Sequence, residues 1–315
     1  MTDFALLFPG QGSQSVGMLA DLAERHGLVR ETFEQAGRQL DLDLWALVSK
    51  GPEEALNRTE ITQPALLTAS VAMWRVWNDR GGPQPARMAG HSLGEYSALV
   101  AAGALDFEDA VRLVAERGRQ MQSAVPEGSG TMAAILGLDD EVVEAICREA
   151  AEDQTVVPAN YNSPAQVVIA GHAAAVERAM HKCSEAGARR TVRLPVSVPS
   201  HSPLMQPAAD AMEKILGATE IQTPAVPVVH NVDMETRESP DDIRAALVAQ
   251  LTGPVRWSES VRAICGEGIM TLAECGPGRV LCGLGRRIER QASWVALSDP
   301  DSFDETIAKL KDESA

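Results

Sequence analysis

The chain has 315 residues, of which 45 % are hydrophobic, 4 % are aromatic and 23 % are charged, and its formal net charge is −16. This length and composition suit one large domain, or a large domain with a smaller insert, built around an aliphatic core. The negative charge argues against general nucleic-acid binding, and no apolar run reaches the roughly 20 residues of a membrane-spanning helix.

The N-terminal third predicts strands that alternate with helices. The apolar run Phe4–Phe8 ends at Pro9, which is typical of a buried strand. Residues 63–77 are apolar nearly all round and predict a buried helix, and Pro64 suits the start of that helix. The segment ARMAG at residues 86–90 predicts a short strand, as do the later segments PVVHNVD and IMTLAECG. This order indicates an α/β domain with a parallel sheet.

The middle of the chain has a different order of elements. We predict strands at residues 131–136, 155–160, 166–171 and 190–196, and helices at residues 139–151 and 173–186. The turn signal YNSPA joins the two central strands. This βαββαβ order is typical of a ferredoxin-like unit. We therefore expect a large subdomain, residues 1–127 and 199–315, with an inserted ferredoxin-like subdomain at residues 128–198.

A Gly-x-Ser-x-Gly sequence follows the strand at residues 86–90 and precedes a helix. Such a strand-to-helix turn forces its serine, here Ser92, into a strained backbone conformation and projects the hydroxyl above the sheet edge. The N-terminus of the following helix offers free N–H groups that stabilise an anionic intermediate. We therefore interpret Ser92 as a nucleophile, with a plain glycine-rich turn as the alternative.

A nucleophilic serine needs a base. His201 lies in VSVPSHSPLM, a loop that follows a predicted strand and precedes a helix opened by Ser202 and Pro203. Active-site bases are common in such loops, although an ordinary surface histidine remains the alternative. The other histidines lie in polar segments, at helix edges, at the end of a strand or inside the turn of Ser92: His26, His91, His172, His181 and His230.

The loop PGQGSQ follows the first strand. Its pattern lacks the third glycine of a dinucleotide-binding loop, because Ser15 takes that place, and no strand-ending acid follows about 20 residues later. Exposed N–H groups of the loop can instead supply half of an oxyanion hole. A purely structural turn is the third interpretation.

Two polar side chains fall on apolar faces of predicted helices. Arg117 lies on the apolar stripe of the helix that Asp106 caps. A buried guanidinium needs a partner, which is either a structural carboxylate or the carboxylate of a substrate. Gln250 ends a helix whose inner face carries Ile243 and Leu247, so its side chain points inward as well.

A set of segments in a fixed order resembles the malonyl-CoA:acyl carrier protein transacylases, a family related to the acyltransferase domains of polyketide synthases. These are FPGQGSQ, GHSLGEYSAL, Arg117, NYNSP, VPSHS, HNVD and ECGPGRVL, and they cover nearly the whole chain. The resemblance implies an α/β-hydrolase-like large subdomain with a parallel sheet and a ferredoxin-like insert. It also implies a free-standing enzyme that supplies malonyl groups to type II fatty-acid synthesis.

The resemblance implies roles for individual residues. Ser92 is the nucleophile, and His201 is its general base and then its general acid. The main-chain carbonyl of Gln250, rather than an aspartate, orients His201. The N–H groups of Gln11 and Leu93 form the oxyanion hole.

Arg117 pairs with the malonyl carboxylate by the same resemblance. The segment from Val198 to His201 matches neither common modular polyketide form and suits a free-standing malonyl enzyme, although methylmalonyl stays open. The reaction is ping-pong and needs neither a cofactor nor a metal.

The resemblance also implies two partners, malonyl-CoA and an acidic acyl carrier protein. Because this chain is acidic too, local cations must dock the carrier protein or the CoA phosphates. The candidates are two arginine pairs, for which solvated surface charge is the alternative: Arg189, Arg190, Arg286 and Arg287. Since no long apolar stripe is exposed in the predicted helices, we expect a monomer.

The five cysteines form no C-x-x-C pair, and the segment MTDFALLFPG is not typical of a signal peptide. Both observations predict a cytoplasmic protein with reduced thiols. Two other functions stay open. A serine hydrolase such as a thioesterase does not need Arg117, and the intact Ser92 and His201 argue against a non-catalytic module that binds a carrier protein.

Overall fold

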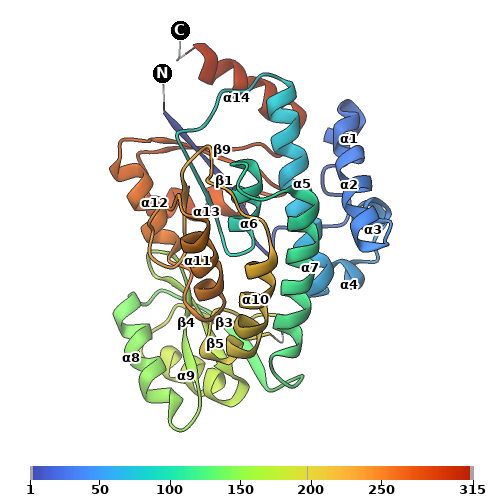
Figure 1. Cartoon of the computed structure of the whole chain (residues 1–315). Helices are drawn as coiled ribbons and strands as arrows, with labels where there is room; N and C mark the ends of the chain where they lie inside the picture. The colour runs from blue at the N-terminus through green and yellow to red at the C-terminus, as the bar shows by residue number, and fades with distance from the viewer. Residues whose placement is uncertain (1–2, 197, 313–315) are drawn as a thin grey trace.

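A five-stranded parallel sheet forms one end of the molecule in the computed structural model, which describes residues 3–196 and 198–312 (Figure 1). Its strand order is β7-β2-β1-β8-β9. The strands are β1 (Phe4–Phe8), β2 (Arg87–Gly90), β7 (Val228–Val229), β8 (Thr271–Glu274) and β9 (Ser293–Ala296). The central strand β1 is apolar and buried along its whole length, as expected for a parallel strand covered on both faces.

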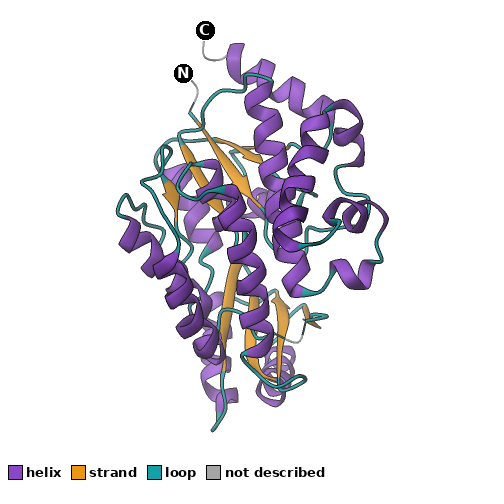
Figure 2. Ribbon diagram, turned by 45° about the vertical axis from the view of Figure 1, so that its right-hand side comes forward, coloured by secondary structure: helices purple, strands orange, loops and turns teal. Residues whose placement is uncertain are grey.

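A four-stranded antiparallel sheet lies at the other end (Figure 2). It consists of β3 (Gly130–Leu136), β4 (Val156–Ser163), β5 (Gln166–His172) and β6 (Arg190–Arg193), packed against α8 (Asp140–Ala151) and α9 (Ala173–Glu185). The order β4-β5-β3-β6 is that of a ferredoxin-like unit. The predicted fold class, a parallel-sheet α/β unit with a ferredoxin-like insert, is confirmed.

The edges of the insert differ from the prediction in detail. Strand β4 continues to Ser163, so most of the expected turn YNSPA is strand. Strand β6 ends at Arg193, two residues before Pro195, whose ring nitrogen has no hydrogen to donate to a ladder. The second sheet falls inside residues 128–198, whose exact limits stay a prediction, and Ser197 lies outside the described residues.

The remaining helices surround the parallel sheet, and all except α14, which follows β9, connect its strands (Figure 1). They are α1 (Ala20–Arg25), α2 (Gly27–Leu40), α3 (Leu44–Lys50), α4 (Glu53–Leu56), α5 (Thr59–Asp79), α6 (Gly94–Ala101), α7 (Phe107–Ser123), the 3₁₀ turn η1 (Pro203–Met205), α10 (Gln206–Ala218), α11 (Pro240–Thr252), α12 (Trp257–Gly266), α13 (Val280–Ile288) and α14 (Pro300–Asp312). None of the described helices is long and apolar enough to cross a membrane.

The predicted position of Pro64 at a helix start was wrong. Helix α5 begins at Thr59, so Pro64 lies inside it, where its ring removes one N–H from the helical ladder. The helix tolerates this loss because nearly every residue from Thr62 to Trp77 is buried, and tertiary packing then outweighs the local penalty.

Alternate residues of β1 point to the two faces of the parallel sheet. Leu6 and Phe8 belong to an apolar cluster with α5, α6 and α7, whereas Ala5 and Leu7 belong to a second cluster with α12 and α13. Phe8 pairs with Gly90, so the carboxyl ends of β1 and β2 lie side by side. The loop after β1 and the turn of Ser92 therefore meet at the same edge of the sheet.

Candidate active site

The turn between β2 and α6 holds Ser92 in a strained conformation. Its φ angle is 52°, in the left-handed region that a non-glycine residue seldom adopts. A Cβ atom on Gly90 would lie 1.9 Å from the backbone of Gly94, and one on Gly94 would lie 2.0 Å from the Phe8 carbonyl oxygen. Both glycines of the motif are therefore required by close backbone packing, as a nucleophile turn demands.

His201 contacts the Ser92 hydroxyl. The distance from Ser92 Oγ to His201 Nε2 is 2.7 Å, and His201 Nδ1 lies 2.7 Å from the Gln250 carbonyl oxygen. A carbonyl oxygen only accepts, so Nδ1 carries the proton and Nε2 is free to accept the hydrogen of the serine hydroxyl. This is the tautomer that a general base next to a nucleophilic serine needs.

Burial keeps the imidazole neutral. His201 is only 3 % exposed, and its pKa is lowered from 6.5 to about 3. Desolvation is the main cause and the positive charge of Arg117 contributes in the same direction, while the hydrogen bond to the Gln250 carbonyl opposes them. At neutral pH the ring is therefore unprotonated and ready to accept a proton.

Arg117 is a buried cation held by two neutral amides. It is 0 % exposed, and its Nη1 and Nη2 donate to Gln63 Oε1 and Gln250 Oε1, each at 2.9 Å. Nη2 also lies 3.4 Å from Ser92 Oγ, and the guanidinium carbon lies 5.4 Å from the centroid of the Tyr96 ring. Among the described residues no carboxylate forms an ion pair with Arg117.

The missing carboxylate has a chemical consequence. Burial lowers the pKa of Arg117, yet a guanidinium remains protonated in a protein. Its Nε is buried and has no hydrogen-bond partner among the described residues. A buried charge is expensive unless it is paired, so the site is suited to a ligand that brings a carboxylate next to Ser92.

Two backbone N–H groups near Ser92 remain available. Among the described residues, neither the Gln11 nor the Leu93 N–H donates a hydrogen bond, whereas the Gly12 N–H donates to Gln14 Oε1. Gly10 packs tightly on the turn, because a Cβ there would lie 2.4 Å from the carbonyl oxygen of His91. These positions fit an oxyanion hole formed by loops that follow two neighbouring strands.

The four predicted docking arginines are exposed and lie outside this cluster. Arg190 pairs with Leu136, whereas the opposite end of β3 at Gly130 packs against Pro199 beside His201. Six residues of strand span about 20 Å, so Arg190 and its neighbour Arg189 are remote from the base. On α13, Arg286 and Arg287 are also exposed, and Arg287 Nη1 donates to Gln166 Oε1 at 2.6 Å.

Several residues of the site were missed in the sequence. They form a buried polar network behind the nucleophile: Gln63, Glu95, His230 and Asn231. A signal for Glu95 existed, because it is the one charged residue between Ser92 and Leu105. Asn231 belongs to the segment HNVD that carries the resemblance, but nothing in that segment indicates its partners, which are about 140 residues away.

The geometry combines a strained serine, a neutral histidine and a buried cation, and comparison with known proteins identifies the family. A family model described as "Acyl transferase domain" matches residues 5–294. The chain belongs to this acyl transferase family.

Similar proteins include malonyl CoA-acyl carrier protein transacylases. The malonyl CoA-acyl carrier protein transacylase of Escherichia coli (strain K12) is 58 % identical over 303 residues, which cover 96 % of this chain and 98 % of that protein. The solved structure of the transacylase of this name from Coxiella burnetii superposes with a TM-score of 0.97 at 52 % identity, covering 98 % of each chain.

A third comparison involves a partner. The structure of a malonyl-transacylase in complex with a type II polyketide synthase acyl-carrier protein superposes with a TM-score of 0.97 at 55 % identity. The match covers 98 % of this chain and 99 % of that one. The family that the sequence motifs indicated is thus confirmed. This acyl transferase is an enzyme of the transacylase type.

Proposed function

We propose that this acyl transferase moves a malonyl group from malonyl-CoA to the phosphopantetheine thiol of an acyl carrier protein, for type II fatty-acid synthesis. The observation that carries the proposal is the buried guanidinium of Arg117, 3.4 Å from Ser92 Oγ and without a carboxylate partner among the described residues. A malonyl group provides both the carbonyl that Ser92 attacks and the carboxylate that this cation lacks.

The first half-reaction forms a malonyl ester on Ser92. His201 Nε2 takes the hydroxyl proton as Ser92 Oγ attacks the thioester carbon. The N–H groups of Gln11 and Leu93 stabilise the negative oxygen of the tetrahedral intermediate. The C–S bond then breaks, and His201 returns its proton to the sulfur of coenzyme A, which leaves as a thiol.

The second half-reaction runs the same steps in reverse with a different thiol. His201 removes the proton from the phosphopantetheine thiol, and the thiolate attacks the ester carbon. The C–O bond to Ser92 breaks, and His201 returns the proton to Oγ. The carbonyl of Gln250 holds the imidazole in the required tautomer throughout, which is the task of an aspartate in other serine enzymes. Each step uses groups of the chain and the substrates, so the reaction requires no cofactor or metal.

Arg117 selects the acyl group. With malonyl bound, its free N–H groups meet the terminal carboxylate, whereas an acetyl group would leave the cation buried and unpaired. The sequence from Val198 to His201 suits a free-standing malonyl enzyme. Substituted malonyl groups keep the carboxylate, so discrimination against them depends on the space around the carbon between the two carbonyls.

The partner is an acidic acyl carrier protein. We expect the exposed pairs Arg189–Arg190 and Arg286–Arg287 to contact it or the phosphates of coenzyme A, since the chain as a whole is negatively charged. We further propose that the enzyme acts as a monomer in the cytoplasm, where its five cysteines stay reduced.

A partition experiment tests transfer against hydrolysis. The protein is incubated with malonyl-CoA, with and without a holo acyl carrier protein, and both malonyl carrier protein and free malonate are measured. With the carrier protein present, we expect malonyl carrier protein as the main product. Without the carrier protein, we expect release of one equivalent of coenzyme A and little malonate. Free malonate as the main product in both arms would favour a thioesterase and refute the proposal.

A further inference from the structure

The edge strand of the parallel sheet, β7, ends before it reaches the level of the nucleophile. Strand β7 consists of two residues, and these pair with Met88 and Ala89 of β2. The chain then leaves the sheet at His230, so no strand residue remains to pair with Gly90 and Ser92. Buried backbone groups at such a position must find other partners.

The side chain of Asn231 takes the place of the missing strand. Its Nδ2 donates to the Gly90 carbonyl oxygen at 2.7 Å, and its Oδ1 accepts from the Ser92 N–H at 2.7 Å. The carboxamide therefore offers one donor and one acceptor to the strained turn, as a peptide group of a parallel neighbour would. Asn231 is 1 % exposed, so water does not compete for these groups.

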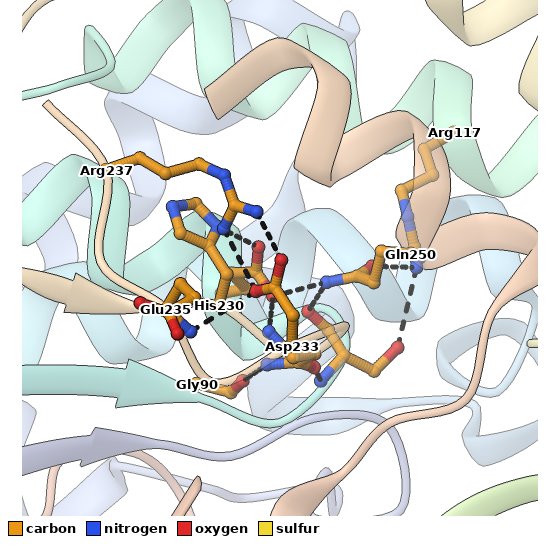
Figure 3. A network of polar contacts seen from close by, with 10 residues as sticks. Gly90, Arg117, His230, Asp233, Glu235, Arg237 and Gln250 are labelled. Atoms are coloured by element: carbon orange, nitrogen blue, oxygen red, sulfur yellow. Dashed lines mark hydrogen bonds and ion pairs between the residues drawn. The ribbon is translucent and has the colours of Figure 1, made fainter. Parts of the chain in front are cut away.

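A buried carboxylate holds the main chain of Asn231, and so the base of this carboxamide, in place. Glu95 is 0 % exposed and accepts from the Asn231 N–H at 3.0 Å and from Gln250 Nε2 at 2.9 Å. Its other oxygen lies 2.7 Å from His230 Nδ1. His230 directly follows β7 and Gln250 lies in α11, so this carboxylate joins two different segments of the chain; both side chains are labelled in Figure 3.

Glu95 also fixes which way the Gln250 amide faces. A carboxylate accepts and a guanidinium donates, so Nε2 of Gln250 must face Glu95 and Oε1 must face Arg117. Nε2 also donates to the Ser92 carbonyl oxygen at 3.1 Å. The Gln250 amide therefore links both Ser92 and Arg117 to the buried carboxylate of Glu95.

We propose that Asn231, whose main chain is held by Glu95, is the positioning residue of the nucleophile: its carboxamide substitutes for a strand residue and holds Ser92 in the left-handed conformation. The inference rests on the proposed role of Ser92 as the nucleophile. Because the carboxamide occupies the Ser92 N–H, that group is withdrawn from the reaction, and the Leu93 N–H is the one left to face the oxyanion. Without Asn231 the turn relaxes and the hydroxyl leaves the line between His201 Nε2 and the thioester.

The test compares two substitutions of Asn231 with a stability control. Asn231→Ala removes both hydrogen bonds, and Asn231→Asp retains the acceptor toward Ser92 but loses the donor toward Gly90. Thr32→Val, in α2, removes a buried hydroxyl whose hydrogen-bond partners, within residues 3–196 and 198–312, are the Leu28 carbonyl of α2 and Arg75. For each protein, rapid quenching and mass spectrometry give the rate constant of Ser92 malonylation at saturating malonyl-CoA, and calorimetry gives the unfolding temperature.

The affinity for malonyl-CoA is measured separately by titration calorimetry in a Ser92→Ala background, with and without Asn231→Ala, where no ester can form. We expect Asn231→Ala to slow malonylation about 100-fold, because small displacements of a nucleophile cost roughly this much, and to change the dissociation constant less than about threefold. We expect the malonylation rate constant of Asn231→Asp to lie between those of Asn231→Ala and the native protein. Thr32→Val lowers the unfolding temperature and leaves malonylation unchanged.

An Asn231→Ala protein that malonylates at the native rate, with only a lowered unfolding temperature, would overturn the inference. Where that variant does not fold, an Asn231→Asp protein with the native rate constant overturns it equally. Equal losses in affinity and in the rate constant would also contradict a positioning role. If the native protein forms no ester on Ser92, the proposed nucleophile itself fails, and the arm without substitutions detects that failure independently.

Discussion

Arg117→Ala is the perturbation that bears most directly on substrate selection. The guanidinium has five N–H groups, of which two donate to the amide oxygens of Gln63 and Gln250 at 2.9 Å. A third points to Ser92 Oγ at the longer distance of 3.4 Å, and the remaining two, which include the unpartnered Nε, are available to a substrate carboxylate. Removing the side chain therefore deletes the whole carboxylate site while leaving Ser92 and His201 in place.

The magnitude follows from the hydrogen bonds that are lost. A hydrogen bond to a charged group contributes about 1.5–3 kcal/mol, so a two-point contact contributes about 3–6 kcal/mol. This corresponds to a loss of about 10²–10⁴ in kcat/KM for malonyl-CoA, at about 1.4 kcal/mol for each factor of ten. Transfer of an acetyl group, which has no carboxylate, should not suffer this loss and should rise relative to malonyl.

The assay is a competition between malonyl-CoA and acetyl-CoA, with products on the carrier protein separated by mass. Arg117→Lys keeps the charge but loses the planar two-point geometry, so we expect an intermediate ratio. Arg119→Ala is the matched control, because Arg119 lies on the exposed face of the same helix and forms an ion pair with Glu116. An Arg117→Ala enzyme that keeps the native preference for malonyl would refute the role of the cation.

Three further predictions concern the base and the surface. Because the charge of Arg117 lowers the pKa of His201, Arg117→Ala should move the acid limb of kcat/KM for acetyl-CoA to higher pH, and an unmoved limb would contradict this coupling. The pKa of His201 is near 6.5 in the unfolded chain and about 3 in the folded protein, so acidification favours the unfolded state. Between about pH 8 and about pH 5, the free energy of unfolding of His201→Gln should therefore fall by about 2 kcal/mol less than that of the native protein, which denaturant unfolding measures. Reversal of the docking arginines to glutamate should raise KM for the carrier protein at low salt, and a flat KM would exclude these positions: Arg189, Arg190, Arg286 and Arg287.

Local constraints explain why much of the site could be predicted. The turn of Ser92 is encoded by Gly90 and Gly94, whose close contacts leave no room for a side chain. Arg117 and Gln250 could be singled out because helical periodicity places both on buried faces. Each of these signals lies within one element or its immediate neighbours, where spacing along the chain fixes geometry.

What failed depends on contacts between distant segments. The Glu95 carboxylate accepts a hydrogen bond from the Asn231 N–H, 136 positions away in the sequence. Neither the residue types nor their spacing predicts such a pair. Pro64 lies inside α5 because burial of the whole helix outweighs a local preference that the sequence displays clearly. The shortness of β7 was equally hidden, since PVVHNVD has the composition of a longer strand.

Mass spectrometry after brief exposure to malonyl-CoA, without a carrier protein, addresses most directly whether one hydroxyl carries the acyl group. We expect a single malonyl adduct on the peptide that contains Ser92, its disappearance when holo acyl carrier protein is added, and its absence from Ser92→Ala. Malonyl transfer that proceeds with no adduct on Ser92, or with an adduct on another residue, would contradict the mechanism.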